Sequence, residues 1–122
     1  MIIALEEHYV DPEVARHWKE GGPEARDAAL RERLHDVGAL RIREMDEAGI
    51  DIQVLSHSAP ATQRLDADAA PALARAANDR LRETVQRSKG RFEAFAVCRA
   101  RIRAPPPTSS SAQSASSASR AR

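Results

Sequence analysis

Three short apolar runs alternate with longer amphipathic segments along this chain. The runs are IIAL at residues 2–5, IDIQVLS at residues 50–56 and RFEAFAV at residues 91–97. The first run begins with β-branched residues, and all three are too short for a typical helix, so each favours a buried strand. The pattern therefore predicts the order strand, helices, strand, helix, strand.

Two helices are predicted directly after the first run. The segment DPEVARHWKE at residues 11–20 begins with Asp11 as an N-cap and Pro12 at the first helical position. The segment PEARDAALRERLHDVG at residues 23–38 has only a weak apolar face of alanine and leucine. We therefore expect this second helix to lie outside the core.

Two further helices have clearer apolar stripes. In residues 39–50, Ile42 and Met45 share a stripe and Gly49 provides the stop. A longer helix is expected to begin at a cap formed by Asp66 or Asp68 and to run through Lys89. Its stripe is expected to contain Leu73, Ala77, Leu81 and Val85.

Strands that alternate with helices form parallel βαβ units, whose crossovers are right-handed. The predicted fold class is therefore α/β. A doubly wound sheet and a (β/α)₈ barrel both begin in this way. No glycine-rich loop follows the first run, which argues against a dinucleotide-binding or P-loop protein.

Charge is distributed unevenly along the chain. Residues 1–97 carry 14 Lys/Arg and 18 Asp/Glu, whereas residues 98–122 carry five Arg and no acid. The acidic body argues against nucleic-acid binding.

The single cysteine excludes an internal disulfide and fits a reducing compartment. No apolar stretch is long enough to span a membrane. We expect a cytoplasmic protein with neither nucleic-acid nor membrane partners.

The candidate chemistry lies in the triplet Glu6, Glu7 and His8, directly after the first apolar run. In a regular strand Glu6 and His8 share a face, and Glu7 points the other way. A carboxylate and an imidazole at the carboxyl end of a barrel strand can bind one divalent cation. Taken alone, however, such a triplet is more often a solvated loop.

Three blocks in order resemble the amidohydrolase-related family of metal-dependent hydrolases. They are ALEEHYVDPE, RIREMDEAGIDIQVLSHSAPATQ and LARAANDRLRETVQRSKGRFEAFAV, and together they extend over about residues 2–97. The branch that they resemble contains the γ-resorcylate and 2,3-dihydroxybenzoate decarboxylases. The resemblance implies a TIM barrel, of which residues 1–97 supply the first three βα units.

The resemblance also implies one divalent metal ion, zinc or manganese, with Glu6 and His8 as its first two ligands. In the family, a further His and an Asp from later strands complete the site, so no catalytic residue is assigned in this chain. The implied activity is non-oxidative decarboxylation of a small aromatic or related carboxylic acid by a homo-oligomer. Ser56 and His57, at the end of the second strand, are candidates for the substrate pocket, and Cys98 is expected to be non-catalytic.

Two other functions stay open at this point. One is a metal-dependent hydrolase of the same superfamily. The other is a small non-catalytic binding module that uses its basic tail for interaction. A barrel needs about 250 residues, whereas this chain has 122, so we expect an inactive fragment with poor stability of its own.

The segment from residue 98 to residue 122 departs abruptly from the family pattern. It consists almost wholly of Arg, Ala, Pro and Ser, as in a disordered basic tail. In GC-rich DNA the same composition arises from out-of-frame reading. A frame that begins at the third base of the Val97 codon can encode LPRADPRPPADVLERAVRELGF, which continues the family pattern. We therefore hypothesise that this tail is a frameshift product.

Sequencing the gene across the codons for residues 96–99 tests this hypothesis. We expect codons that encode the shifted peptide in the alternative frame. Codons that are incompatible with that peptide would contradict the frameshift and leave the natural basic tail.

Overall fold

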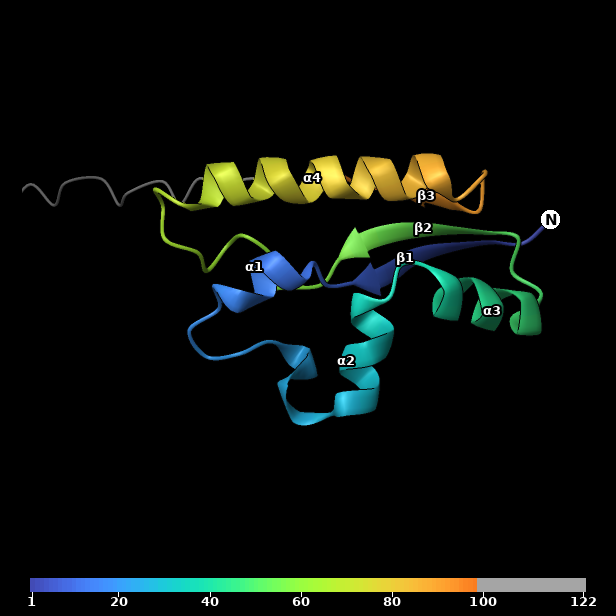
Figure 1. Cartoon of the computed structure of the whole chain (residues 1–122), viewed down its shortest axis with the longest axis horizontal. Coiled ribbons are helices and arrows are strands. Elements are labelled where there is room, and N and C mark those ends of the chain that lie inside the picture. Colours follow the sequence, from blue (N-terminus) through green and yellow to red (C-terminus); the bar gives the residue numbers. More distant parts are fainter. Residues whose placement is uncertain (99–122) are drawn as a thin grey trace, which may run out of the picture.

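The computed structural model describes residues 1–98, which form one three-stranded parallel sheet with helices beside it (Figure 1). The strands are β1 (Ile3–Tyr9), β2 (Ile52–His57) and β3 (Phe92–Ala94), in the spatial order β1-β2-β3. The predicted parallel α/β arrangement is therefore confirmed. The tail proposed to be frameshifted lies outside the described residues, except for Cys98.

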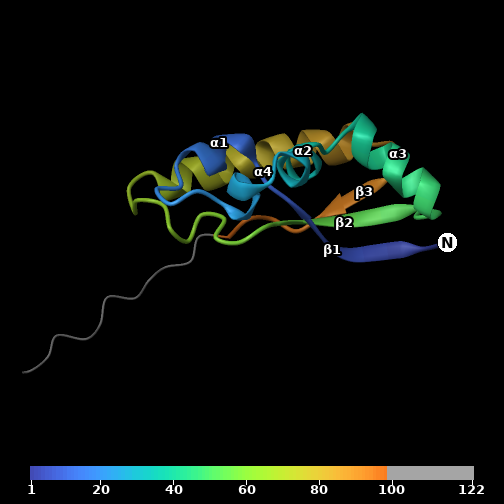
Figure 2. The same cartoon turned by 90° about the horizontal axis from the view of Figure 1, so that it is seen from below.

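The helices all lie on one face of the sheet and leave its other face bare (Figure 2). This arrangement suits both the first part of a barrel and one half of a doubly wound sheet, so the fold class depends on comparison with known structures. The helices are α1 (Pro12–Arg16), the short 3₁₀ helix η1 (Pro23–Arg26), α2 (Ala28–His35), α3 (Ala39–Ala48) and α4 (Ala70–Arg87).

Helix α1 begins as predicted but is shorter than the segment DPEVARHWKE. Asp11 is its N-cap and accepts hydrogen bonds from two backbone N–H groups of the first turn. The helix ends at Arg16, after which Trp18 packs into the core and its indole N–H donates to the carbonyl of Ala61 at 2.8 Å. This tertiary contact holds the chain beyond α1 outside a helix.

Helix α3 follows the sequence prediction closely. Met45 is its buried residue, and Gly49 ends the helix in the left-handed region with φ 71°. Helix α2 has no fully buried residue, but its Leu34 is partly buried and packs against the core cluster of Val10, Val14, Trp18 and Ala77, so the helix is not wholly outside the core as expected.

The predicted start of α4 is wrong. Its N-cap is Ala69, and neither Asp66 nor Asp68 caps it with a side chain. The Asp66 carboxylate instead forms an ion pair with Lys19 at 3.1 Å. The two residues are 47 positions apart, so a local sequence pattern could not predict this contact. The buried stripe is also shifted by one position at its start, since Ala74 is buried and Leu73 is partly exposed. The buried residues of α4 are Ala70, Ala74, Ala77 and Leu81.

Strand β3 is shorter than the predicted segment 91–97 because a side chain of α4 captures the chain beyond it. The Asn78 amide donates to the carbonyl of Val97 at 3.0 Å, and its carbonyl oxygen accepts the Val97 N–H at 2.7 Å. These bonds take the place of further pairing with β2. The pairing between the two strands ends at Leu55 and Ala94, where the Phe95 N–H donates to the carbonyl of Leu55.

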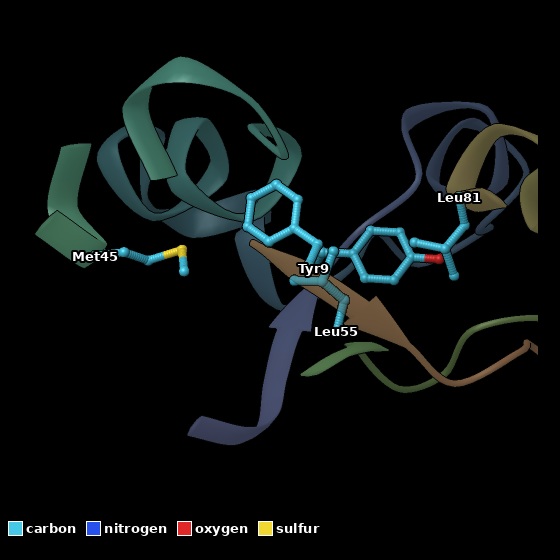
Figure 3. Packing of buried hydrophobic residues seen from close by; sticks show 5 residues of the cluster. Tyr9, Met45, Leu55 and Leu81 are labelled. Atoms are coloured by element: carbon cyan, nitrogen blue, oxygen red, sulfur yellow. The ribbon is translucent and has the colours of Figure 1, made fainter. Parts of the chain in front are cut away.

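The main core lies between the sheet and helices α3 and α4. Tyr9 and Leu55 from the sheet lie between Met45 of α3 and Leu81 of α4, and Phe92 of β3 completes the cluster (Figure 3). A second cluster beside it contains Val10, Val14, Trp18 and Ala77. Within residues 1–98, no helix is long and apolar enough to cross a bilayer.

Truncation of Leu55 tests the importance of the main core. Leu55 is fully buried, so we expect Leu55→Ala to lower the free energy of unfolding by about 2–5 kcal/mol. Urea denaturation followed by circular dichroism measures this loss. As a control, Leu30→Ala on the exposed face of α2 should change the value by less than about 0.5 kcal/mol. Equal effects of the two substitutions would contradict this account of the core.

Candidate metal centre

Strand β1 contains a bulge at the position of the candidate metal ligands. Ala4 pairs with Gln53 and Glu7 pairs with Leu55, so two residues of β1 stand opposite Val54 alone. Bulges of this kind bend a strand and redirect side chains, and they are frequent next to active sites.

Glu6 lies within this bulge and has a φ of 57°, in the left-handed region that non-glycine residues rarely adopt. A residue held there costs about 1–3 kcal/mol and persists only where the surrounding structure imposes it, as often at functional sites. Strict alternation along the strand, on which the sequence prediction relied, therefore does not hold at Glu6. The shared face of Glu6 and His8 stays a prediction.

The strand register beyond the bulge separates the next two residues. Glu7 pairs with the buried Leu55 and lies on the face covered by helices. His8 pairs with Ser56 and lies on the bare face, since side chains alternate along a strand. Ser56 is therefore the neighbour of His8 at the carboxyl end of the sheet, where the sequence placed it as a pocket residue.

The donors at this strand end fit part of a metal site. Glu6 and His8 are exposed, and a carboxylate oxygen and an imidazole nitrogen suit manganese or zinc. Among residues 1–98, no three His, Cys, Asp or Glu side chains lie close enough to hold a metal ion together. The assignment of Glu6 and His8 as the first two ligands of a metal ion stays a prediction.

His57 lies on the opposite face from His8 and is engaged by the backbone. Its Nε2 accepts the N–H of Asp11 at 3.0 Å, and its Nδ1 lies 2.9 Å from the carbonyl oxygen of Ser58. The accepting Nε2 assigns the proton to Nδ1, which donates to Ser58. The ring also packs edge-on against Tyr9 and Trp18. These contacts give His57 a structural position, and its predicted contact with substrate stays a prediction.

Asp11 is buried and lies at the centre of a hydrogen-bond network. The sequence predicted Asp11 only as the N-cap of a helix. Its Oδ1 accepts the N–H groups of Glu13 and Val14 at 3.0 Å, and its two carboxylate oxygens accept two bonds from Arg80 at 2.8 Å. Burial acts to raise the pKa of Asp11, but the hydrogen bonds from Arg80 and Val14 and the charge of Arg80 outweigh it and keep the pKa below its ordinary value.

Arg41 holds the main chain at the candidate ligand His8. One of its terminal nitrogens donates to the carbonyl of His8 at 2.9 Å and to that of Arg33 at 3.0 Å, while its Nε donates to the carbonyl of Asp36 at 2.9 Å. Burial lowers the pKa of Arg41, and the charges of Glu7 and Asp36 oppose this change. Sequence reasoning missed this residue, because its partners are backbone atoms of other elements.

A large cleft lies at the other end of the sheet. It is lined by residues that precede the strands, among them Met1, Asp51 and Arg91. It is therefore separate from the candidate ligands at the carboxyl end of β1. Cys98, after β3, is exposed and has a free thiol.

Comparison with known proteins decides the fold class. No family model matches the chain. It is 42% identical over 96 residues to the γ-resorcylate decarboxylase of Polaromonas sp. strain JS666, a match that covers 78% of this chain and 29% of that enzyme. The γ-resorcylate decarboxylase of Rhizobium radiobacter is 38% identical over 105 residues, with the same coverage. This chain is similar to the N-terminal third of these decarboxylases over most of its own length.

Solved structures of decarboxylases match the same part of the chain. The 5-carboxyvanillate decarboxylase of Novosphingobium aromaticivorans, with bound manganese and a nitrobenzoic acid, has a TM-score of 0.70 and 30% identity, covering 80% of this chain and 34% of that protein. The dihydroxybenzoic acid decarboxylase of Polaromonas, also with manganese, has a TM-score of 0.67 and 41% identity, covering 79% and 29%. These relatives are TIM barrels, so the described residues form the first βα units of a barrel, as predicted.

The charge of Asp11 should contribute to stability in a pH-dependent way. Asp11→Asn keeps an oxygen at the cap but removes the charge that Arg80 binds, so we expect a loss of about 1–3 kcal/mol in the free energy of unfolding at pH 7. Because the folded pKa lies below the unfolded value, the contribution is present above about pH 4 and is lost as the pH falls through the folded pKa.

Urea denaturation at pH 7 and pH 3 measures this difference between the wild type and Asp11→Asn. The matched control is Asp79→Asn on the exposed surface of α4, which should change stability little at either pH. A deficit for Asp11→Asn that stays constant across this pH range would contradict the role of the charge.

Proposed function

We propose that this chain forms the first metal-binding part of a metal-dependent, non-oxidative decarboxylase of aromatic carboxylic acids. One observation carries the proposal: an exposed carboxylate at the bulge of β1, Glu6, and an exposed imidazole near the carboxyl end of the strand, His8, occur in a chain that is similar to manganese-bound decarboxylases. The chain spans about 29% of the length of the curated relatives that it matches, so the activity belongs to the whole barrel.

The residues of this chain have distinct tasks in the proposed site. Glu6 and His8 each offer one donor atom to a divalent cation, manganese or zinc. When bound, that cation would orient an aromatic acid through its oxygens and stabilise developing negative charge. Arg41 holds the backbone carbonyl of His8 and thereby limits movement of the ligand. Ser56 lies beside His8 on the same face and is placed to line the pocket.

The proposed substrate is a small hydroxylated aromatic acid. The relatives are named for γ-resorcylate, dihydroxybenzoic acid and 5-carboxyvanillate, which share a benzene ring with a carboxylate and a hydroxyl or methoxyl group. A cytoplasmic location, homo-oligomeric assembly of the whole enzyme and the lack of nucleic-acid or membrane partners belong to the same proposal.

A chimeric enzyme tests the proposed ligands. Residues 1–97 of this chain replace the matching segment of the Polaromonas γ-resorcylate decarboxylase, and the product is assayed with manganese for loss of γ-resorcylate. We expect activity from the chimera and none from the 122-residue chain alone, because two donors hold a metal ion too weakly for catalysis.

Substitutions in the chimera separate the candidate ligands from their neighbour. Glu6→Gln and His8→Gln should each lower the manganese content at least about tenfold, as measured by elemental analysis of the purified protein. The control Glu7→Gln, which alters the residue between them on the helix-covered face, should retain its manganese. Full manganese content in the His8→Gln chimera would contradict the assignment, as would turnover by the unmodified chain alone.

A further inference from the structure

The imidazole of His57 connects several elements at the carboxyl end of the sheet. It stands at the end of β2, and its Nε2 accepts the N–H of Asp11, the N-cap of α1, at 3.0 Å. Its Nδ1 donates to the carbonyl of Ser58 at 2.9 Å. The ring packs edge-on against Tyr9 of β1 and against Trp18 beyond α1, with centroid distances of 5.0 and 6.1 Å. The ring therefore joins β2 to the end of β1 and to both ends of α1.

The hydrogen bonds of this ring require its neutral form. In a neutral imidazole one nitrogen donates and the other accepts, and both roles are filled in His57. A second proton on Nε2 would face the N–H of Asp11, and two donors cannot share one hydrogen bond. Protonation of His57 therefore requires its ring to leave the Asp11 N–H.

Within residues 1–98, the titratable groups that adjoin the ring are Tyr9 of β1, Asp11 at the start of α1 and Arg80 of α4. Tyr9 stays neutral, because burial raises its pKa. The Asp11 carboxylate would attract an imidazolium, but its oxygens already accept bonds from Arg80 and from two backbone N–H groups. The guanidinium of Arg80, bound to that carboxylate, opposes a further positive charge beside it.

The pH at which the contact weakens follows from the chemistry of imidazole. A histidine ring in water changes its charge near pH 6.5. If only the released ring binds the proton, each pH unit below that value multiplies the released population by up to about tenfold. The contact with Asp11 is then present at neutral pH and is lost as the pH falls below about 6.5. The Asp11 carboxylate does not titrate in this range, since its pKa lies below the ordinary value of 3.8.

We propose that His57 is an acid-sensitive latch, which holds the start of α1 against β2 while its ring is neutral and releases it on protonation. Release takes one proton from solvent onto Nε2 and breaks the hydrogen bond from the Asp11 N–H. It also separates the ring from Tyr9 and Trp18. Because His57 lies on the opposite face of the sheet from His8, the latch is independent of the proposed metal site.

Amide hydrogen exchange of the full chain, followed by nuclear magnetic resonance, tests the latch. The observable is the protection factor of the Asp11 amide, which compares its exchange rate with that of an unstructured chain at the same pH. We expect this factor to fall at least about tenfold from pH 7 to pH 5. The neighbouring Val10 N–H donates to the backbone carbonyl of Leu34 at 2.9 Å, an acceptor that does not titrate. Its protection should change less than about twofold, since local opening leaves other contacts in place.

Two substitutions assign the effect to one ring. His57→Gln places an amide oxygen near the position of Nε2, where it can accept the Asp11 N–H without titrating. The pH dependence of the Asp11 amide should disappear in this variant. The matched control is His17→Gln, which changes an exposed histidine beside Glu13 at the other end of α1. This control should keep the pH dependence of the wild type.

The nitrogen-15 shifts of the His57 ring test the same idea without a substitution. At pH 7 we expect a protonated Nδ1 and an unprotonated Nε2, and the reverse tautomer would contradict the latch.

The exchange data can overturn the latch in several ways. Constant or rising protection of the Asp11 amide on acidification would show that the charged ring keeps its contact. Equal loss at Asp11 and Val10 would indicate general loosening of the fold. A fall that persists in His57→Gln would assign the titration to another group, and an Asp11 amide without protection at pH 7 would exclude the contact itself.

Discussion

A carboxylate that is removed from water needs partners that replace its hydration, and the Asp11 carboxylate finds them on two helices. Its side chain binds the first turn of α1 and the guanidinium of Arg80 on α4, and its backbone N–H binds the ring of His57 on β2. Loss of one partner would leave a buried group unsatisfied. This requirement joins β1, α1, β2 and α4 at the carboxyl end of the sheet, and the rings of Tyr9 and Trp18 pack around the same histidine.

The two faces of the sheet differ in what they contain. The helix side contains the core and the network around Asp11, and it provides the stability of the described residues. The bare side contains His8 and Ser56, which no helix covers. Arg41 connects the two sides, since it donates from the helix layer to the backbone carbonyl of His8. This bond fixes the backbone of His8 from the helix layer.

Similarity to the decarboxylases does not by itself give this chain their activity, since the chain spans about 29% of their length. The helix side is complete enough to align with manganese-bound decarboxylases over about 80% of the chain. The bare side contains His8, one of the two candidate donors, and the exposed apolar side chains of Ile3, Leu5 and Phe95.

The sequence by itself determined the features that depend on residues close together in the chain. The apolar runs located all three strands, although β1 extends beyond its run to Tyr9 and contains Glu6, Glu7 and His8. Asp11 with Pro12 predicted the start of α1, and Gly49 predicted the end of α3, because caps act over one or two turns. The resemblance of three ordered blocks then supplied the barrel, the family and the pair Glu6 and His8.

Only the tertiary structure decided the rest. Arg80 pairs with Asp11, which the sequence showed only as a helix cap. The ion pair of Lys19 with Asp66 accompanies the later start of α4, and the hydrogen bonds of Asn78 with Val97 shorten β3. The tertiary structure also introduced the bulge at Glu6, which a strict period of two cannot reveal. Each of these features depends on which distant groups meet when the helices pack on the sheet, and a local pattern contains no information about such partners.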